Sequence, residues 1–263
     1  MASARYRFDE NPLTVQSRVI WALILRETRV TFGNAQLGYL WAIANPILTT
    51  TIMVLIFSFI SRMPPIGTSF ILFFATGIIP FEMYNKLANS LMAVFTQNKG
   101  LMTYPLVKET DAVFARYLLV IATYFLVLLV FFSTLIITGF APWPHNPGSA
   151  IAAIFCLSLF GLGVGVTNAV VKCLWGTWPQ IYGIISRPLF FISGIFFIPT
   201  TFPPYITDWL AWNPLLHFID WFRAAYYINY ESVIFDGPFL FYVTTGLLLT
   251  GFGGARLFRK KLA

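Results

Sequence analysis

Charged residues are scarce in this sequence. Lys, Arg, Asp and Glu make up only 10% of the 263 residues, whereas 58% are hydrophobic and the mean hydropathy is +0.75. A water-soluble protein of this length needs many more polar side chains to cover its surface. The composition therefore excludes a soluble globular domain and indicates a polytopic membrane protein.

Side chains that build catalytic, metal and disulfide sites are also scarce. The two cysteines, Cys156 and Cys173, lie in or beside apolar stretches without a CxxC motif, so neither a disulfide framework nor a metal site is indicated. His145 and His217 are far apart, and each is interpreted as a hydrogen-bonded interface residue. No GxxxxGK(S/T) motif and no Ser/His/Asp arrangement is present. We therefore expect no catalytic residue, cofactor or metal in this chain, which by itself is not predicted to be an enzyme.

The first 36 residues differ from the rest of the chain. Within 13–32, Arg18, Arg26 and Arg29 fall in an arc of about 80° on a helical wheel, opposite several aliphatic residues. This pattern predicts an amphipathic helix lying on the membrane surface. No charged residue follows for about 26 positions, and no small-residue cleavage pattern appears, so we predict a retained first span rather than a signal peptide.

The remaining chain, 37–263, is predicted to form one transmembrane domain with six spans. The predicted spans are 37–60, 69–92, 113–140, 149–171, 180–198 and 237–255. Gly161 and Gly165 in the fourth span have the small-xxx-small spacing that permits close helix packing. The predicted fold class is thus an all-α polytopic membrane protein with an N-terminal amphipathic interface helix.

Two connecting segments are predicted to carry helices of their own. The polar loop 93–111 has room for one short helix. The aromatic segment 199–236 is broken by Pro203-Pro204 and Asn213-Pro214, and it is long enough for two half-helices that re-enter the membrane between spans five and six.

The distribution of Lys and Arg orients the chain. Six spans place both ends on one side, and only Arg62 and Arg223 fall in the opposite loops. The other side receives most of the basic residues, which also explains the net charge of +7: Arg5, Arg7, Arg18, Arg26, Arg29, Lys99, Lys108, Lys172, Arg256, Arg259, Lys260 and Lys261. By the positive-inside rule, both termini are predicted to be cytoplasmic.

Charges inside the predicted spans need partners. Glu82 and Lys86 are four residues apart and could form a helix-surface pair, while Arg116 and Arg187 could snorkel to headgroups. Alternatively, the cations form a cytoplasmic-side ring around an anionic substrate. Glu27 lies on the apolar side of the surface helix and is expected either to pair locally with Arg29 or to contact another helix or subunit.

The aromatic residues of 199–236 also leave two interpretations open. They form an interface belt, or some of them stack on sugar rings along a carbohydrate path. In the same segment, Asp220 and Arg223 are three residues apart and are expected to pair.

The stretch from Leu25 to Pro46, the loop around 98–108 and the segment Trp212–His217 together resemble a known family. They are similar to the membrane subunit (permease) of ABC transporters that export capsular polysaccharide, the KpsM type. The resemblance implies a channel-forming subunit in the bacterial inner membrane that moves lipid-linked polysaccharide from cytoplasm to periplasm. It further implies a homodimer with two separate ATPase subunits, which bind ATP and Mg, and a continuing path through a periplasmic co-polymerase and an outer-membrane channel.

Two sets of site residues follow from this resemblance. Predicted to couple the chain to the ATPase are Glu27, Gln97, Asn98, Lys99, Leu101, Tyr104, Pro105 and Lys108. Predicted to line or flank the substrate path are Arg26, Arg29, Lys86, Arg116, Arg187, Trp175, Trp178, Trp209, Trp212 and Tyr226.

Other functions remain as alternatives. O-antigen and teichoic-acid exporters share these features more loosely. A membrane-embedded acyl- or glycosyltransferase would need a clustered acidic or histidine motif, which is absent. A proton-coupled secondary transporter would use Glu82 or Asp220, but no internal repeat supports it.

Overall fold

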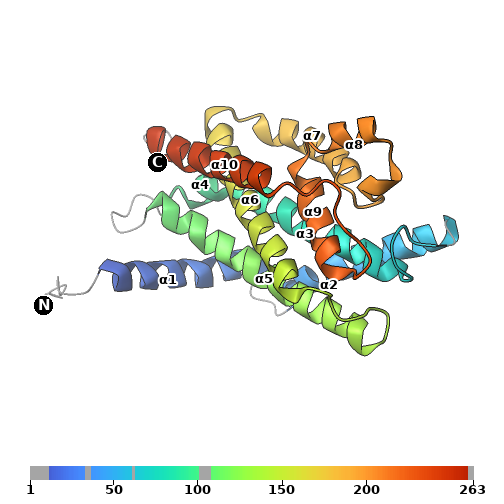
Figure 1. The fold of residues 1–263 in the computed structure, drawn as a ribbon. Coiled ribbons are helices and arrows are strands. Elements are labelled where there is room, and N and C mark those ends of the chain that lie inside the picture. Colours follow the sequence, from blue (N-terminus) through green and yellow to red (C-terminus); the bar gives the residue numbers. More distant parts are fainter. Residues whose placement is uncertain (1–11, 33–36, 61–62, 101–107, 260–263) are drawn as a thin grey trace, which may run out of the picture.

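The computed structural model describes residues 12–32, 37–60, 63–100 and 108–259 and contains no strand in these ranges. The chain folds into helices connected mostly by short turns (Figure 1). They are α1 (Pro12–Phe32), α2 (Leu37–Ile60), α3 (Phe70–Met92), α4 (Val94–Asn98), α5 (Glu109–Ile137), α6 (Pro147–Leu174), α7 (Trp178–Ile192), the 3-10 helix η1 (Pro199–Thr201), α8 (Pro204–Leu210), α9 (Pro214–Tyr226) and α10 (Gly237–Leu257). The expected all-helical class is confirmed.

Side-chain caps fix where several helices begin. Asn146 and Asn213 each precede a proline and accept a hydrogen bond from a backbone N–H of the first turn, at 3.0 Å from Ser149 and 3.1 Å from Leu215. Asp236 caps α10 in the same way. A capping oxygen satisfies a donor that the helix cannot, and proline needs no partner at this position. Asn146-Pro147 and Asn213-Pro214 are therefore helix starts, whereas Pro46 lies inside α2.

Most helices begin and end within a few residues of their predicted bounds. The largest difference is the fifth predicted span, expected to reach 198, because α7 ends at Ile192. Gly194 then takes a left-handed conformation with φ +78°, which an α-helix cannot continue. By length and composition, α5, α6 and α10 are able to cross a membrane, and α2 contains a shorter apolar helical stretch, Ala44–Phe57.

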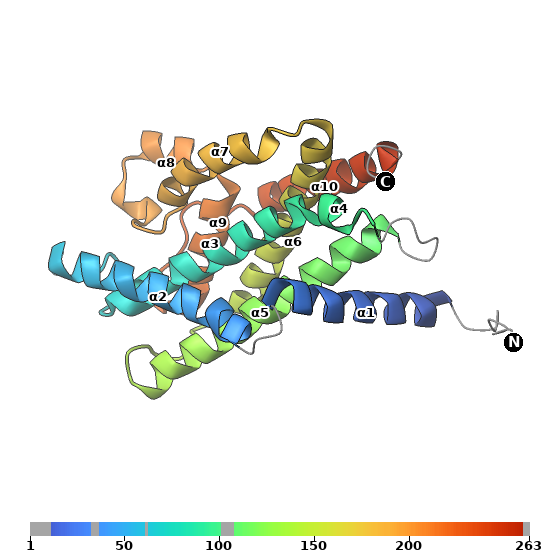
Figure 2. The same ribbon diagram turned by 180° about the vertical axis from the view of Figure 1, so that it is seen from behind.

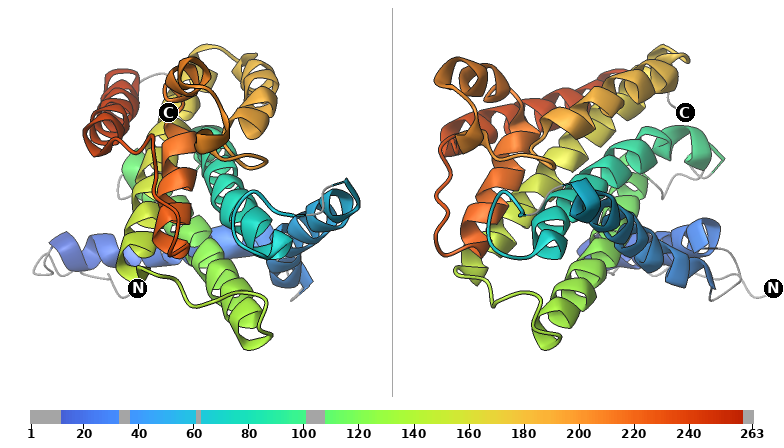
Figure 3. Two further views of the ribbon diagram at one scale, coloured as in Figure 1. Left: turned by 45° about the vertical axis from the view of Figure 1, so that its right-hand side comes forward. Right: turned by 90° about the vertical axis from the view of Figure 1, so that its right-hand side faces the viewer.

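Helix α6 is the centre of the fold and packs on α3 along one side and on α10 along another (Figures 1 and 3). Gly161 and Gly165 lie against α3 so closely that an added Cβ would approach Leu87 to 2.9 Å and Leu91 to 2.7 Å. The predicted close packing at these glycines is confirmed. Because neither contact has room for a methyl group, the separation of α3 and α6 is fixed.

Helix α1 lies outside this core and packs mainly on α5 (Figure 2). The beginning of α1 and the end of α10 lie toward the same side of the molecule, while α8 lies toward the opposite side (Figures 1 and 2). The molecule therefore has one end with the beginning of α1 and the end of α10, and α8 lies toward the other end.

The segment predicted to contain two half-helices contains α8 and α9. Helix α9 has 13 residues, about 20 Å, whereas crossing the hydrocarbon takes about 30 Å. Most of α9 is buried against α6 and α3, whereas no residue of α8 is buried.

Arg223 of α9 is completely buried and binds backbone carbonyls. Its guanidinium donates to the carbonyl oxygens of Gly194, Ile195, Phe197 and Phe73, and it stacks 4.1 Å from the Phe73 ring centroid. The predicted Asp220–Arg223 pair does not form. Asp220 instead accepts hydrogen bonds from the hydroxyls of Tyr230 and Ser232, because these groups lie on the loop that follows α9.

We predict that Gly165→Ala destabilises the protein, because the added methyl group would meet Leu91 in a contact with no room. Overpacking of this kind costs about 1–3 kcal/mol. The matched control is Gly246→Ala, since a Cβ at Gly246 meets no atom within 4 Å. Thermal unfolding of the purified protein in detergent measures both. Equal midpoints for the two variants would contradict the close packing.

Candidate coupling site

Helices α1 and α5 are joined by a buried ion pair. Glu27 of α1 is 2% exposed and Arg116 of α5 is 6% exposed. Arg116 Nε donates to Glu27 Oε2 at 3.1 Å, and Arg116 Nη2 donates to the same oxygen. A buried charge is costly unless it is paired and fully hydrogen-bonded. This pair therefore explains why an acidic residue lies on the apolar side of α1.

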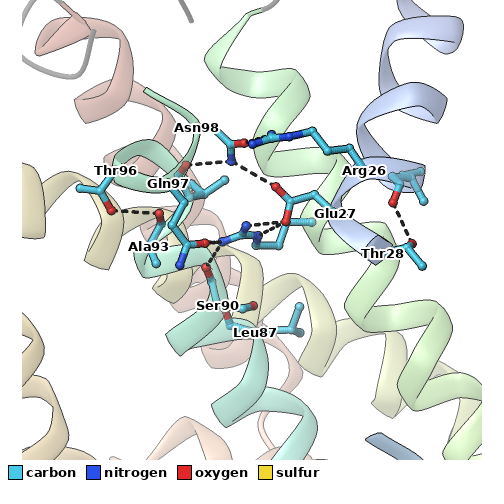
Figure 4. Close-up of polar contacts among 12 residues, drawn as sticks. Arg26, Glu27, Thr28, Leu87, Ser90, Ala93, Thr96, Gln97 and Asn98 are labelled. Atoms are coloured by element: carbon cyan, nitrogen blue, oxygen red, sulfur yellow. Dashed lines mark hydrogen bonds and ion pairs between the residues drawn. The ribbon is translucent and has the colours of Figure 1, made fainter. Parts of the chain in front are cut away.

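The short helix α4 and the end of α3 complete the site. Arg116 Nη1 donates to the side-chain oxygen of Gln97 at 2.6 Å and to the backbone oxygen of Ser90 at 3.0 Å. Asn98, which is 1% exposed, donates to Glu27 Oε1 at 3.3 Å and accepts from Arg26 Nη1 at 2.6 Å. Figure 4 shows Arg26 and Glu27 reaching Asn98 from α1. We call Arg26, Glu27, Gln97, Asn98 and Arg116 the coupling cluster.

Further polar contacts surround the coupling cluster. Gln16 of α1 donates to Asp111 of α5 at 2.7 Å, and Lys172 at the end of α6 donates to Thr96 of α4 at 3.1 Å.

One more ion pair lies at the same end of the molecule. Arg259, just after α10, pairs with Glu109 at the start of α5 at 2.8 Å, and the Arg259 side chain is 67% exposed. Exposed pairs contribute little to stability. Of these two ion pairs, the buried one joins α1 to α5, whereas the exposed one joins the end of α10 to α5.

The predicted coupling residues divide into buried and exposed groups. Asn98 and Glu27 are buried in the coupling cluster, whereas Gln97, Lys99 and Lys108 are exposed. Leu101, Tyr104 and Pro105 lie outside the described residues. Of the two interpretations of Glu27, the structure shows the contact with another helix. Helix α4 therefore presents a polar outer face while its inner face is tied to α1 and α5.

The predicted ring of cations is not assembled as expected. Arg116 and Arg26 come together, but they bind Glu27 and Asn98 within the chain, so their guanidinium groups are committed to the coupling cluster. Arg29 is exposed on α1.

Two cations of the predicted ring lie elsewhere. Lys86 on α3 and Arg187 on α7 are both exposed, and neither makes a hydrogen bond or an ion pair with the described parts of the chain. The expected pair of Glu82 with Lys86 is absent, and one carboxylate oxygen of Glu82 is buried without a partner there.

The predicted aromatic residues also differ in exposure. Trp175 and Trp178 lie next to each other with centroids 6.1 Å apart, and Trp178 donates to Asn168 of α6 at 3.0 Å. Trp209 and Trp212 are exposed at the end of α8. Tyr226 is 2% exposed and donates to the carbonyl oxygen of Pro142 at 3.0 Å. The Tyr226 ring is therefore enclosed in the core of the single subunit, and its place on a substrate path stays a prediction.

The sequence reasoning missed how the cluster is connected. Gln97 is predicted only to couple the chain to the ATPase, yet it also binds Arg116, and the Arg26–Asn98 contact is not predicted. A signal was present, because one acid on the apolar face of α1 and one arginine at the start of an apolar helix are complementary charges.

The chain belongs to the ABC-2 type transporter family, whose model matches residues 18–227. It is thus a membrane component of a transporter. It is 32% identical to the polysialic acid transport protein KpsM of Escherichia coli over 258 residues, which cover 98% of this chain and 97% of that protein.

Other relatives have matching names. The chain is 28% identical to the capsule polysaccharide export inner-membrane protein BexB of Haemophilus influenzae, over 94% of both chains. It is 21% identical to the O-antigen export system permease protein RfbA of Klebsiella pneumoniae, over 87% of this chain and 86% of RfbA. The resemblance found in the sequence is therefore confirmed.

We predict that Glu27→Gln lowers stability far more than Glu109→Gln, although each removes one carboxylate from an ion pair. The first leaves Arg116 buried without a counter-charge, at a cost of about 3–5 kcal/mol, whereas the second loses an exposed pair worth about 0–1 kcal/mol. Thermal unfolding in detergent separates the two. Replacing both Glu27 and Arg116 by Gln should recover part of the loss. Similar midpoints for the two single variants would show that the buried pair is not a main contact.

Proposed function

We propose that this protein is the transmembrane, channel-forming subunit of an ATP-driven exporter of lipid-linked capsular polysaccharide. The observation that carries the proposal is the attachment of α4 to the coupling cluster. A short helix with an exposed polar face, joined through Asn98 and Gln97 to two longer helices, is suited to transmit motion from a protein bound below it. The names of the relatives KpsM and BexB support the substrate class.

The proposed topology has six spans, α2, α3, α5, α6, α7 and α10, in a bacterial inner membrane. Helix α1 lies on the cytoplasmic surface, and α8 with α9 re-enters from the periplasmic side. Both termini are then cytoplasmic, consistent with α1 beginning and α10 ending toward the same side (Figure 1). The short length of α9 and its burial support the re-entrant placement.

The proposed assembly contains two copies of this chain and two ATP-binding subunits that hold ATP and Mg. A periplasmic co-polymerase and an outer-membrane channel continue the path. ATP-driven closure of the ATPases pushes on 97–108, and Asn98 and Gln97 pass the movement to Glu27 and Arg116. Because that pair joins α1 to α5, the movement reaches both helices, and a channel opens between the two copies.

Lys86 and Arg187 are the proposed contacts for the anionic end of the polymer. Aromatic contacts place α7 beside α3, since Phe190 lies 5.1 Å from Phe81 and the hydroxyl of Tyr182 bonds that of Tyr84. Arg187 is exposed beside Ile184 and Phe191, which are also exposed. A charge at membrane depth requires a partner or an aqueous path. A phosphate or an acidic sugar in a channel between the two copies supplies one.

O-antigen export is a second candidate, which the more distant similarity to RfbA favours. Proton-coupled transport has less support, because Asp220 is bound by Tyr230 and Ser232.

We expect this chain to co-purify with its ATP-binding subunit as a two-plus-two complex that hydrolyses ATP. Asn98→Ala should leave ATP hydrolysis but reduce ATP-driven export at least about tenfold, because loss of the buried amide contacts separates α4 from α1. Asn89→Ala is the matched control, since Asn89 is exposed and, among the described residues, bonds only Asn85 of its own helix.

The readouts are stoichiometry, ATPase rate and polymer export from vesicles. A chain that transports without any ATP-binding subunit would refute the proposed function. A complex in which Asn98→Ala exports normally would refute the coupling role of α4.

We expect Arg187→Ala to reduce export about tenfold while the amount of assembled complex and its ATPase activity stay normal, because the polymer loses a charge contact. Arg187→Lys should retain most export. Gln180→Ala, also exposed on α7, is the control. Export of labelled polymer by cells with equal protein amounts measures the effect, and unchanged export by Arg187→Ala would remove this residue from the path.

A further inference from the structure

A cavity of about 600 Å³ lies between α8, the loop before α10 and the first turn of α10. Its lining includes Phe202, Thr207, Asp208, Trp212, His217, Asp236 and Phe239. A cavity of this volume is in the range that holds small organic ligands. It is separate from the coupling cluster and from Lys86 and Arg187.

The cavity lies at the end of the molecule opposite the coupling cluster. Asp236 and Phe239 lie at the start of α10, whereas Arg259, which pairs with Glu109 near that cluster, follows the end of the same helix. Helix α10 has 21 residues and is about 31 Å long. Under the proposed direction of transport, the cavity is therefore near the exit of the polymer.

The charge of the cavity is negative. Asp208 and Asp236 line it, whereas no lysine or arginine among the described residues does. Asp236 uses one oxygen to cap α10, and Asp208 makes no hydrogen bond or ion pair with the described parts of the chain. Carboxylate oxygens therefore remain to accept hydrogen bonds from a ligand.

His217 does not add positive charge, because both of its ring nitrogens are already used. Nε2 donates to the carbonyl oxygen of Ala211 at 2.7 Å, and Nδ1 accepts from the backbone N–H of Asp236 at 3.3 Å. These bonds define a neutral imidazole that joins the end of α8 to the start of α10. The part of the cavity lined by Ala211, His217 and Asp236 is thus held in place before any ligand binds. This lowers the conformational entropy lost on binding.

Aromatic rings supply the remaining contacts. Trp212 is 76% exposed and lines the cavity together with Phe202 and Phe239. Ring faces offer flat apolar surface at little conformational cost. Flat rings beside acceptor oxygens suit a pyranose, whose C–H groups lie on its faces and whose hydroxyls lie at its rim.

We propose that this cavity binds uncharged sugar units of the exported polymer, with neighbouring hydroxyls donating to Asp208 and Asp236 and a ring face on Trp212. This inference rests on the proposed export function. Acidic sugars are excluded, because a carboxylate on the ligand would meet two carboxylates of the protein without a compensating cation. The cavity therefore selects the uncharged part of the repeat, while Lys86 and Arg187 contact the anionic end.

The test uses the purified complex with its ATP-binding subunit, in a detergent without a sugar head group. The probes are three uncharged trisaccharides, built of glucose, galactose and N-acetylglucosamine, and an acidic trimer of sialic acid. Saturation-transfer NMR and calorimetry measure binding. We expect at least one uncharged trisaccharide to bind and the sialic acid trimer to bind at least about tenfold more weakly.

Variants locate the binding. Asp208→Asn and Trp212→Ala should each weaken binding of the uncharged trisaccharide about tenfold, since each removes one main contact. Asp236→Asn should do the same while keeping the cap of α10, because asparagine is an equally good N-cap residue. Glu231→Gln, an exposed acid outside the cavity lining, should leave binding unchanged.

Preferred binding of the sialic acid trimer, no binding of any uncharged trisaccharide, or unchanged binding by the three cavity variants would each overturn the inference. ATP-driven export by the same preparation after reconstitution into vesicles separates this result from the function. A complex that exports but binds no trisaccharide keeps its function and loses the cavity inference. A complex that binds at the cavity but does not export with ATP keeps the sugar site and loses the proposed function.

Discussion

The buried ion pair between Glu27 and Arg116 is the contact on which the architecture at the coupling end of the molecule depends. It joins a helix outside the core to a long apolar helix, and the remaining polar atoms of both side chains are satisfied by α4 and by the end of α3. Two desolvated charges are stable only in this fully bonded arrangement. A displacement of α4 therefore cannot leave α1 and α5 unaffected, and this property is the basis of the proposed coupling role of the cluster.

The rest of the molecule resists deformation. The contacts of Gly161 and Gly165 with α3 leave no room for sliding, and Gly163 of α6 lies equally close to Leu247 of α10. Helices α3, α6 and α10 therefore act as one block. Arg187 of α7 and Trp209 of α8 are exposed outside this block, whereas the exposed Lys86 lies on α3 within it.

Much of this fold could be predicted because hydrophobic runs and Asn-Pro breaks depend on local chemistry. The starts of α6, α9 and α10 follow directly from capping residues. Long-range partners could not be predicted in the same way. Spacing on one helix favoured pairing of Asp220 with Arg223. In the structure, Arg223 instead donates to backbone carbonyls such as that of Ile195, and Asp220 accepts from side chains such as that of Ser232. The partners of Arg26 and Arg116 likewise depend on which helix lies beside α1, and sequence spacing carries no such information.

Arg223 has a consequence for how this protein can vary. Four of its acceptors are main-chain carbonyls of Phe73, Gly194, Ile195 and Phe197, so the contact recognises the path of the backbone and not the identity of those side chains. The loop after α7 can therefore change its residues, apart from the glycine that turns it, without losing its attachment. The arginine itself has no such freedom, because a lysine cannot present donors in several fixed directions at once. Among such chains, we therefore expect the arginine to be retained while the residues of the loop it holds vary.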